Sequence, residues 1–331
     1  GCTNCIVANS TPKLLADVYP GFFHTIIVDA PCSGEGMFRR DEQAIRNWTA
    51  YSGKCPEIQR EILGQADRML RPGGRLVYST CTFSVEENEG TVVDFLADHP
   101  GYKIVDVFGS DRAGEEPELQ GSGVSRGLSL KGHDTHFTAR IFPHICNAEG
   151  HFCAVLRKDG NETGGKEVKT NPKIDKNLIE AFGTFARSVL HDERSDVIRS
   201  YFKEHLKIYN GHVYTFNTSL ELPDKIDFAK KGFYIGRIRS GLKGLIFEPS
   251  HQLLTSLRHR DIINTVSLGS ASVELSKYLK GETIFLSEDI VASLKVPCYI
   301  AVEADGFPVG WGKLSSDGTV KNMYPKGWRK Q

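Results

Sequence analysis

The stretch TIIVDAPCSG, residues 25–34, decides the fold that we predict for this chain. A run of apolar and β-branched residues leads without a break into Asp29, and Ala30-Pro31 stops it. A continuous apolar run that ends in an acid is typical of a central strand in a parallel sheet. Cys32 and Gly34 therefore follow the carboxyl end of this strand, where open α/β sheets bind their ligands.

The flanking segments repeat this alternation of strands and helices. Helices are expected at 56–70 and 84–99, and the second opens with a capping box of Ser84 and Glu87. Residues 109–139 are rich in Gly, Ser and charges and predict a long loop, either disordered or a functional flap. The pattern indicates an α/β fold with a parallel, doubly wound sheet, whose other strands are expected at 5–8, 75–79, 102–108 and 151–157.

The second half of the chain predicts two smaller domains. Apolar faces at 178–190 and 197–206 indicate helices, and Asn210-Gly211 indicates a hairpin turn. From residue 242 onward a short helix at 249–258 precedes brief strands at 283–286, 298–303 and 307–313, as in a small β-barrel. We therefore expect four segments: an α/β domain at 1–158, a linker at 159–171, a small α+β connecting domain at 172–241 and the barrel at 242–331.

Charge is distributed unevenly along the 331 residues. The 41 basic and 41 acidic side chains cancel, which argues against a generally basic coat protein for nucleic acids. Residues 1–165, however, carry 16 basic and 22 acidic side chains, whereas 166–241 carry 14 and 10 and 242–331 carry 11 and 9. A basic second half predicts a polyanionic partner for that half.

Several other classes of protein are not expected. No apolar run reaches the ~18 residues of a membrane helix, and no secretory leader opens the chain, so we expect a cytoplasmic protein without membrane contact, acting as a monomer. Eight cysteines are too few for a disulfide scaffold. Cys2 and Cys5 form a C-x-x-C pair without a second pair at zinc spacing, so no metal site is predicted.

Two cysteines follow strand ends that would face one crevice. Cys32 comes after Asp29, and Cys81 comes after the strand at 75–79. Cysteine nucleophiles act as thiolates in polar surroundings, which glycine-bearing turns can supply through their backbone amides. Either cysteine alone could be a small buried apolar residue, but the pair with an acid favours a reactive site.

Two long motifs carry a family resemblance. DAPCSGEGMFR at 29–39 and YSTCTFSVEENE at 78–89 resemble the two cysteine motifs of the Nol1/Nop2/Sun family of RNA cytosine-5 methyltransferases. RIFPH at 140–144 and GHF at 150–152 are similar to a later motif of that family. Four tail segments resemble the PUA-like RNA-binding module of its bacterial small-subunit ribosomal RNA methyltransferases: FEPSH at 247–251, YLKGET at 278–283, GWGK at 310–313 and YPKGWR at 324–329.

The resemblance implies a mechanism and assigns roles to three residues. Cys81 adds to carbon 6 of cytosine, which activates carbon 5 for methylation, and Cys32 assists elimination of the product. Asp29 binds the cytosine edge and supports its protonation. The expected activity is methylation of ribosomal RNA, of the small subunit in particular, with S-adenosylmethionine as cofactor.

The resemblance also implies a Rossmann-like methyltransferase sheet that is incomplete at its N-terminus. The family's glycine-rich cofactor loop and the acid after its second strand are not among these 331 residues, and the family's first strand lies beside the strand that ends at Asp29. Without it that strand has an unpaired apolar edge. Asn9, near the adenine, and Asp29 are the remaining cofactor-binding positions, so we expect the chain alone to be inactive.

RNA contacts are expected from basic and aromatic residues. Arg39 and Arg40 either hold phosphate or are solvated charges at a helix end, and Arg140 and His144 are wall or positioning groups rather than catalysts. A mixture of aromatic and basic residues in the tail suits base stacking and phosphate contact, although a packed barrel with a soluble tail would show the same composition. The tail candidates are Trp311, Lys313, Lys326, Trp328 and Arg329.

Two other functions compete with this one. A non-catalytic RNA-binding or ribosome-assembly factor would explain the missing cofactor loop. A cysteine hydrolase is weaker, because the sequence places no histidine beside Cys32 or Cys81.

Overall fold

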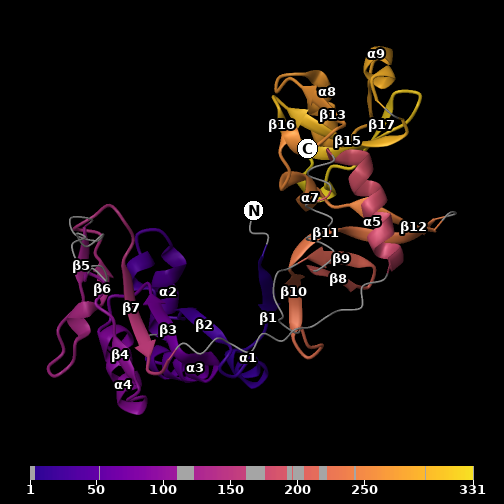
Figure 1. The fold of residues 1–331 in the computed structure, drawn as a ribbon. Coiled ribbons are helices and arrows are strands. Elements are labelled where there is room, and N and C mark those ends of the chain that lie inside the picture. The colour runs from indigo at the N-terminus through magenta and orange to yellow at the C-terminus, as the bar shows by residue number, and fades with distance from the viewer. Residues whose placement is uncertain are drawn as a thin grey trace. The chain divides into compact units, whose positions relative to one another are not determined.

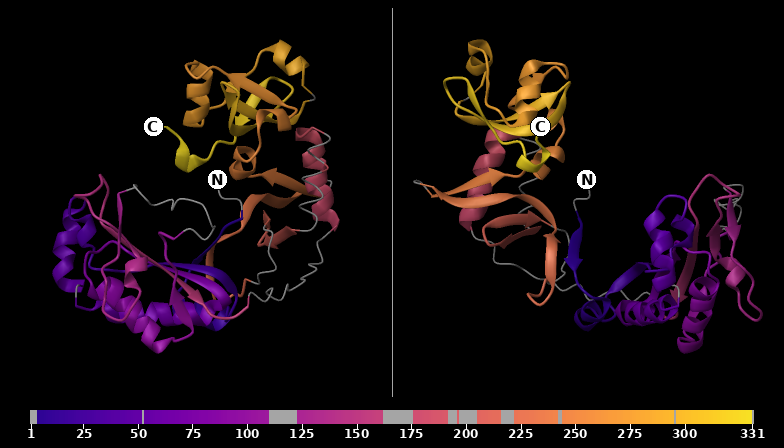
Figure 2. Two further views of the ribbon diagram at one scale, coloured as in Figure 1. Left: turned by 60° about the vertical axis from the view of Figure 1, so that its left-hand side comes forward. Right: turned by 180° about the vertical axis from the view of Figure 1, so that it is seen from behind.

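The computed structural model describes residues 4–51, 53–109, 123–161, 176–191, 196, 205–215, 222–241, 244–294 and 296–330. Three predicted features lie outside these residues: Cys2, most of the linker, and the helix at 197–206 apart from His205 and Leu206. The chain forms two compact units, Ser10–Glu167 and a second made of Gly1–Asn9 with Val168–Gln331 (Figures 1 and 2). Within the described part, no helix has the length and apolar character needed to cross a membrane.

The Ser10–Glu167 unit is built on a mixed sheet. Its strand order is β2 (Phe23–Asp29), β3 (Leu70–Thr80), β7 (His151–Lys158), β6 (Ala139–Ile141) and β5 (Val124–Arg126), with β4 (Tyr102–Ile104) also paired to β7. Among the strand pairs of this sheet, only β2 and β3 run parallel. Strand β7 lies antiparallel to β3, and the remaining pairs are antiparallel as well. The α/β class is confirmed, and four of the five predicted strand segments contribute to this sheet, but the described sheet is not parallel throughout.

Helices cover this sheet and close its core. They are α1 (Pro12–Val18), α2 (Glu42–Tyr51), α3 (Cys55–Met69) and α4 (Thr91–Asp98), and the predicted proline, Pro56, lies in the first turn of α3. Leu63 of α3 and Phe95 of α4 pack with Leu76 of β3 in one buried cluster. The sheet and helices therefore hold the carboxyl ends of β2 and β3 on a rigid support.

Strand β2 lies at the edge of the sheet. It pairs with β3 and with no other strand that the structure describes. Ile27 in its middle is 71% exposed, although the surrounding run is apolar. The prediction of an unpaired apolar edge beside Asp29 is confirmed, and this edge offers free backbone groups to a further strand.

The predicted strand at residues 5–8 has a different partner from the one expected. It forms as β1 (Ile6–Asn9), but it is only partly buried and pairs antiparallel with β10 (Asp227–Lys231), as Figure 1 shows. Backbone N–H and C=O groups of a strand need hydrogen-bond partners, and β10 supplies them here. The expectation of a buried strand in the first sheet is therefore wrong for this structure.

The predicted loop at 109–139 is partly ordered. Residues 110–122 lie outside the described part, whereas β5 and η3 (Thr135–Phe137) follow in this segment and β6 begins at its end. Gly127 brings its backbone so close to Thr138 that a Cβ atom there would lie 1.9 Å from the Thr138 hydroxyl oxygen. The loop prediction missed β5 because a three-residue strand has too few positions to show alternation.

The second unit contains an antiparallel sheet packed on a helix. The strand order is β12 (Gly244–Pro249), β11 (Phe233–Gly241), β9 (His212–Thr215) and β8 (Leu206–Tyr209), with α5 (Lys176–Val189) against it. The predicted hairpin joins β8 and β9, and its turn residues Asn210 and Gly211 have φ values of 50° and 77°, as the type I′ turn requires.

A five-stranded sheet completes this unit as the curled, PUA-like part. Its order is β13 (Thr265–Leu268), β15 (Cys298–Ala304), β16 (Phe307–Leu314), β17 (Thr319–Asn322) and β14 (Ile284–Phe285). The accompanying helices are α7 (His251–Thr255), η4 (His259–Asp261), α8 (Val273–Lys280), α9 (Glu288–Ala292) and η5 (Lys326–Trp328). The strands and the helix expected after residue 242 are thus present.

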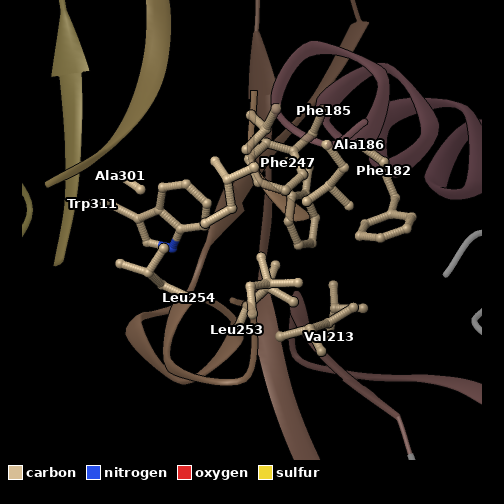
Figure 3. Close-up of a cluster of buried hydrophobic side chains, with 14 of the residues drawn as sticks. Phe182, Phe185, Ala186, Val213, Phe247, Leu253, Leu254, Ala301 and Trp311 are labelled. Atoms are coloured by element: carbon tan, nitrogen blue, oxygen red, sulfur yellow. The ribbon is translucent and has the colours of Figure 1, made fainter. Parts of the chain in front are cut away.

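One hydrophobic core crosses residue 242. Phe182 and Phe185 of α5 contact Phe247 of β12, and Trp311 of β16 packs against Phe185 (Figure 3). The segments proposed as a connecting domain and a barrel domain therefore stabilise each other. Removing one of them exposes the aromatic core of the other.

Candidate active site

Parallel pairing of β2 and β3 places the two cysteine loops side by side. Asp29 is opposite Ser79 in the register, and the loops stay together beyond the strands because Gly36 N–H donates to the Cys81 carbonyl at 2.8 Å. The sulfur atoms of Cys32 and Cys81 are 3.3 Å apart, and both residues are half-buried. The two predicted cysteines therefore form one site.

The hydrogen bond between the thiols separates their acidities. Either sulfur can donate in this contact; when the Cys32 thiol donates, the hydrogen bond stabilises a thiolate at Cys81 and lowers the pKa of Cys81 to about 7. The same hydrogen bond, together with burial, raises the pKa of Cys32. Cys81 is therefore the thiol of the pair that ionises first, and it is partly ionised at neutral pH.

Asp29 lies at the mouth of this site. Its carboxylate is exposed and accepts a hydrogen bond from the Ser79 hydroxyl at 3.5 Å. Its charge also raises the pKa of Cys81, which opposes the larger effect of Cys32. Asn9, the other predicted cofactor-binding residue, belongs to β1 in the second unit, opposite Asp227. The structure therefore does not bring Asn9 into the unit that holds Asp29.

The last three residues of the second motif are buried and hold the loops of the site together. Glu87, Asn88 and Glu89 are at most 1% exposed and lie on the π-helical turn η2 (Glu86–Gly90). Asn88 accepts from the Thr80 hydroxyl and donates to the Thr82 carbonyl at 3.0 Å, so it holds both sides of Cys81.

Glu87 reaches the other cysteine loop. Its carboxylate accepts from the Ser33 N–H and from the Gln59 side chain, both at 3.0 Å, and Gln59 also donates to the Pro31 carbonyl. The predicted capping box is therefore half formed: the Ser84 hydroxyl caps the Glu87 N–H, but the Glu87 side chain turns inward. Burial of this carboxylate fixes the backbone on both sides of Cys32.

Arg140 is buried beneath the site and holds its loops in place. It is 2% exposed, donates to both oxygens of Glu89, and donates to the Phe83 carbonyl at 3.1 Å. The prediction that Arg140 contacts RNA is contradicted, because the salt bridge and burial leave its guanidinium inaccessible. Its alternative role as a positioning group fits this geometry.

Glu35, Gly36 and Gly150 complete the contacts between the loops. Glu35 accepts from the Thr82 hydroxyl and the Phe83 N–H with one oxygen, and from the Trp48 indole N–H with the other. A Cβ atom at Gly36 would lie 2.4 Å from the Gly150 carbonyl oxygen, so this approach requires glycine.

Sequence reasoning missed these buried acids as positioning residues. A helical pattern rotates about 100° per residue, so three consecutive polar residues cannot all face solvent beside a core. The run Glu87-Asn88-Glu89 therefore indicates that at least one of these side chains points inward. The capping-box interpretation gave Glu87 a partner at its own helix end, so it did not predict that the Glu87 side chain is buried.

The predicted RNA contacts divide into exposed and buried residues. Arg39, Arg40 and His144 are exposed, and so are Lys313 and Lys326, while Trp328 is 62% exposed and Arg329 is partly buried. Trp311 is 1% exposed, and its indole N–H donates to the Ser250 carbonyl at 2.9 Å. The prediction that Trp311 stacks on RNA is wrong, because its ring fills the core.

Comparisons with known proteins match both ends of the chain. Residues 1–157 match the family described as 16S rRNA methyltransferase RsmB/F, and residues 265–330 match the family described as the methyltransferase RsmF PUA domain. Ribosomal RNA small subunit methyltransferase F of Erwinia tasmaniensis is 28% identical over 335 residues, and that of Escherichia coli O127:H6 is 27% identical over 341. Each alignment covers 98% of this chain and 63% of the relative, so the chain spans less than two thirds of these relatives.

Two solved structures with sequence similarity come from Pyrococcus horikoshii. A methyltransferase homolog protein is 27% identical, with a TM-score of 0.32 over 45% of this chain and 43% of that one. NSun6 is 28% identical, with a TM-score of 0.32 over 46% of this chain and 34% of that one.

Proposed function

We propose that the protein methylates carbon 5 of cytosine in ribosomal RNA, with the small-subunit RNA as substrate, because residues 1–157 match the 16S rRNA methyltransferase RsmB/F family and residues 265–330 match the RsmF PUA domain. One observation carries the chemistry: two thiols lie 3.3 Å apart, and Cys81 has the lowered pKa.

Cys81 is the nucleophile in this proposal. A pKa of about 7 provides a substantial thiolate fraction at neutral pH, and the thiolate is the form that attacks. Its addition to carbon 6 of cytosine makes carbon 5 nucleophilic, because electron density from the new adduct reaches that carbon. The target base must leave its stack to reach a half-buried sulfur.

Cys32 changes role during the reaction. While Cys81 is a thiolate, the hydrogen bond to it raises the pKa of Cys32 and keeps the proton there. Once Cys81 is bonded to carbon 6, its sulfur no longer carries that charge, and Cys32 can release its proton to water and become a thiolate. Cys32 can then accept the proton from carbon 5 as the bond between Cys81 and carbon 6 breaks.

Asp29 orients the base. Its exposed carboxylate at the end of β2 can accept a hydrogen bond from the exocyclic amine of cytosine or share a proton with the adjacent ring nitrogen. A proton at that nitrogen offsets the charge that develops when Cys81 adds to the ring.

S-adenosylmethionine supplies the methyl group in this reaction. The residues present fit only part of its site, since Asp29 lies at the end of β2 while Asn9 lies in the other unit and the glycine-rich loop is not in the sequence. The exposed edge at Ile27 is consistent with a further strand beside the site. We expect the 331-residue chain alone to bind the cofactor weakly and to be inactive, and calorimetry showing micromolar affinity would contradict this.

The RNA-facing residues of the proposal are those that remain accessible. Arg39, Arg40 and His144 belong to the unit that holds the cysteines, and Lys313, Lys326, Trp328 and Arg329 belong to the second unit. Exposed basic side chains can neutralise phosphates, and an exposed indole can stack on a base. We extend the proposal to a cytoplasmic monomer that acts on ribosomal RNA or the small subunit.

The decisive experiment compares two cysteine variants in the full-length gene product. Cys81→Ala should abolish methylation and form no covalent adduct with RNA. Cys32→Ala should accumulate an adduct that survives denaturing electrophoresis, because attack proceeds while release fails. An adduct formed by Cys81→Ala but not by Cys32→Ala would overturn the assignment.

A non-catalytic RNA-binding factor is the second candidate. The pairing of β1 with β10 favours it, because only one of the two predicted cofactor-binding residues, Asp29, then belongs to the unit that holds the cysteines. The same assay decides, because a non-catalytic factor forms no adduct in either variant and transfers no methyl group.

A further inference from the structure

The sheet β12-β11-β9-β8 has two faces of opposite character. Along β9, Val213 and Thr215 are buried while His212 and Tyr214 point the other way, since side chains alternate along a strand. The buried face, with Leu206, Val213 and Ile235, packs in the core that contains α5. The other face, which we name the tyrosine face, is formed by Lys207, Tyr209, His212, Tyr214, Tyr234, Arg237 and Arg239.

Aromatic rings form a continuous row across the tyrosine face. Ring centroids are 6.0 Å apart for Tyr209 and Tyr214, 5.2 Å for Tyr214 and Tyr234, and 5.5 Å for Tyr234 and His212. His212 is exposed and the three tyrosines are partly exposed. A hydrogen bond of 3.2 Å between the His212 ring and the Tyr234 hydroxyl fixes the end of the row.

Basic side chains surround these rings. Arg237 and Arg239 are 60% and 52% exposed, and each lies 2.6 Å from a different oxygen of Glu248. Lys231 of β10 lies over the Tyr209 ring, 4.5 Å from its centroid. Glu248 is the one acid among the described residues of the four strands, so the face carries a net positive charge.

We propose that the tyrosine face binds a single-stranded segment of RNA outside the target cytosine. The proposal rests on the proposed function, which makes RNA the substrate. A row of partly exposed rings on a sheet stacks bases without sequence preference, and flanking arginines and lysines neutralise the phosphates between them. This face consists of residues 207–239, outside the 265–330 segment that matches the PUA domain.

The proposal predicts a measurable loss of affinity. Binding of the 331-residue chain to a fluorescent single-stranded RNA oligonucleotide is measured by anisotropy at several salt concentrations. Arg237→Gln/Arg239→Gln should weaken binding roughly tenfold and reduce the salt slope by about 0.7 per lost phosphate contact. Arg60→Gln/Arg68→Gln is the matched control, because both arginines are similarly exposed and ion-paired in the other unit.

The stacking component has its own test. Tyr214→Leu should weaken binding roughly tenfold, whereas Tyr214→Phe keeps the ring and should bind like the unchanged protein. Ultraviolet cross-linking followed by peptide mass spectrometry is a second test. It uses the unchanged protein, so its result does not depend on whether a variant folds. Cross-links are expected in peptides that contain Tyr209, Tyr214 or Tyr234.

Two results would overturn the proposal. One is unchanged RNA affinity in both the arginine and the Tyr214→Leu variants, with thermal melting that shows them folded. The other is cross-linking confined to segments outside residues 207–239, the result expected if this face meets a protein surface instead. Neither result bears on adduct formation by Cys81, so failure here is distinguishable from failure of the proposed function.

Discussion

The cysteine site and the tyrosine face place charged side chains in opposite ways. Beside the cysteines three charged residues are inside: Glu87, Glu89 and Arg140 are at most 2% exposed and hold loops in place. On the tyrosine face the charged groups are outside, with Arg237 and Arg239 more than half exposed. A reacting sulfur atom needs a fixed position, which buried ionic contacts supply, whereas a polyanion needs charges that it can reach.

Aromatic residues show the same contrast within the second unit. Trp311 is a core residue with a satisfied indole N–H, and Trp328 is 62% exposed, with its ring set edge-on to His251 at 4.8 Å. The two tryptophans lie 17 positions apart in the same predicted RNA-binding tail. Residue type alone therefore does not say whether an aromatic side chain stabilises the fold or faces a ligand.

Replacing the two tryptophans gives the largest expected difference. Trp311→Ala should lower the free energy of unfolding by about 3–5 kcal/mol through the cavity, with about 1 kcal/mol more for the lost hydrogen bond to Ser250. Trp328→Ala should change stability by no more than about 0.5 kcal/mol. It should weaken RNA binding by about 1–3 kcal/mol if its ring stacks on a base. Urea denaturation and RNA anisotropy measure the two effects, and equal destabilisation by both variants would remove the contrast.

The buried ion pair of the first unit comes next. Arg140→Met should destabilise the protein by about 3–5 kcal/mol, because it leaves the Glu89 carboxylate charged and buried without its partner. Arg140→Met/Glu89→Gln should recover part of that loss, since no uncompensated charge remains. Arg60→Met breaks an exposed pair with Asp94 and should cost at most about 1 kcal/mol in the same denaturation experiment. If Arg60→Met lowered the free energy of unfolding as much as Arg140→Met does, burial of the ion pair would not be the cause of the loss.

The smallest expected change concerns the rate and its pH dependence. In the full-length gene product, Glu87→Gln should slow methylation on the order of 10–100-fold, because the loop around Cys32 loses its anchoring charge. The Glu87 charge raises the pKa of Cys81, so its removal should shift the pH profile of adduct formation to lower pH. In the unchanged protein that profile should rise through pH about 7 as Cys81 ionises.

Glu86→Gln is the control for this prediction. It removes the same charge one residue earlier, where the side chain is exposed and bonded to the Ser84 hydroxyl. It should leave both the rate and the pH profile unchanged. A pH profile that stays in place in Glu87→Gln while the rate falls would limit Glu87 to a structural role.

The sequence alone determined the elements whose pattern is local. The apolar run before Asp29, the helix after Pro56 and the Asn210-Gly211 turn all form where predicted, because strand, helix and turn preferences act over a few residues. The motifs also placed Cys32 and Cys81 at adjacent strand ends, since parallel neighbours share their carboxyl edge.

Only the tertiary structure decided what each polar or aromatic residue touches. Glu87 bonds to Ser33, 54 positions away, rather than to its own helix end, and Arg140 bonds to Glu89, 51 positions away. Trp311 is buried because α5 packs over it, and β1 pairs with β10 instead of joining the first sheet. Burial and pairing depend on segments distant in the chain, and no local pattern of residue types identifies the partner that each residue finds there.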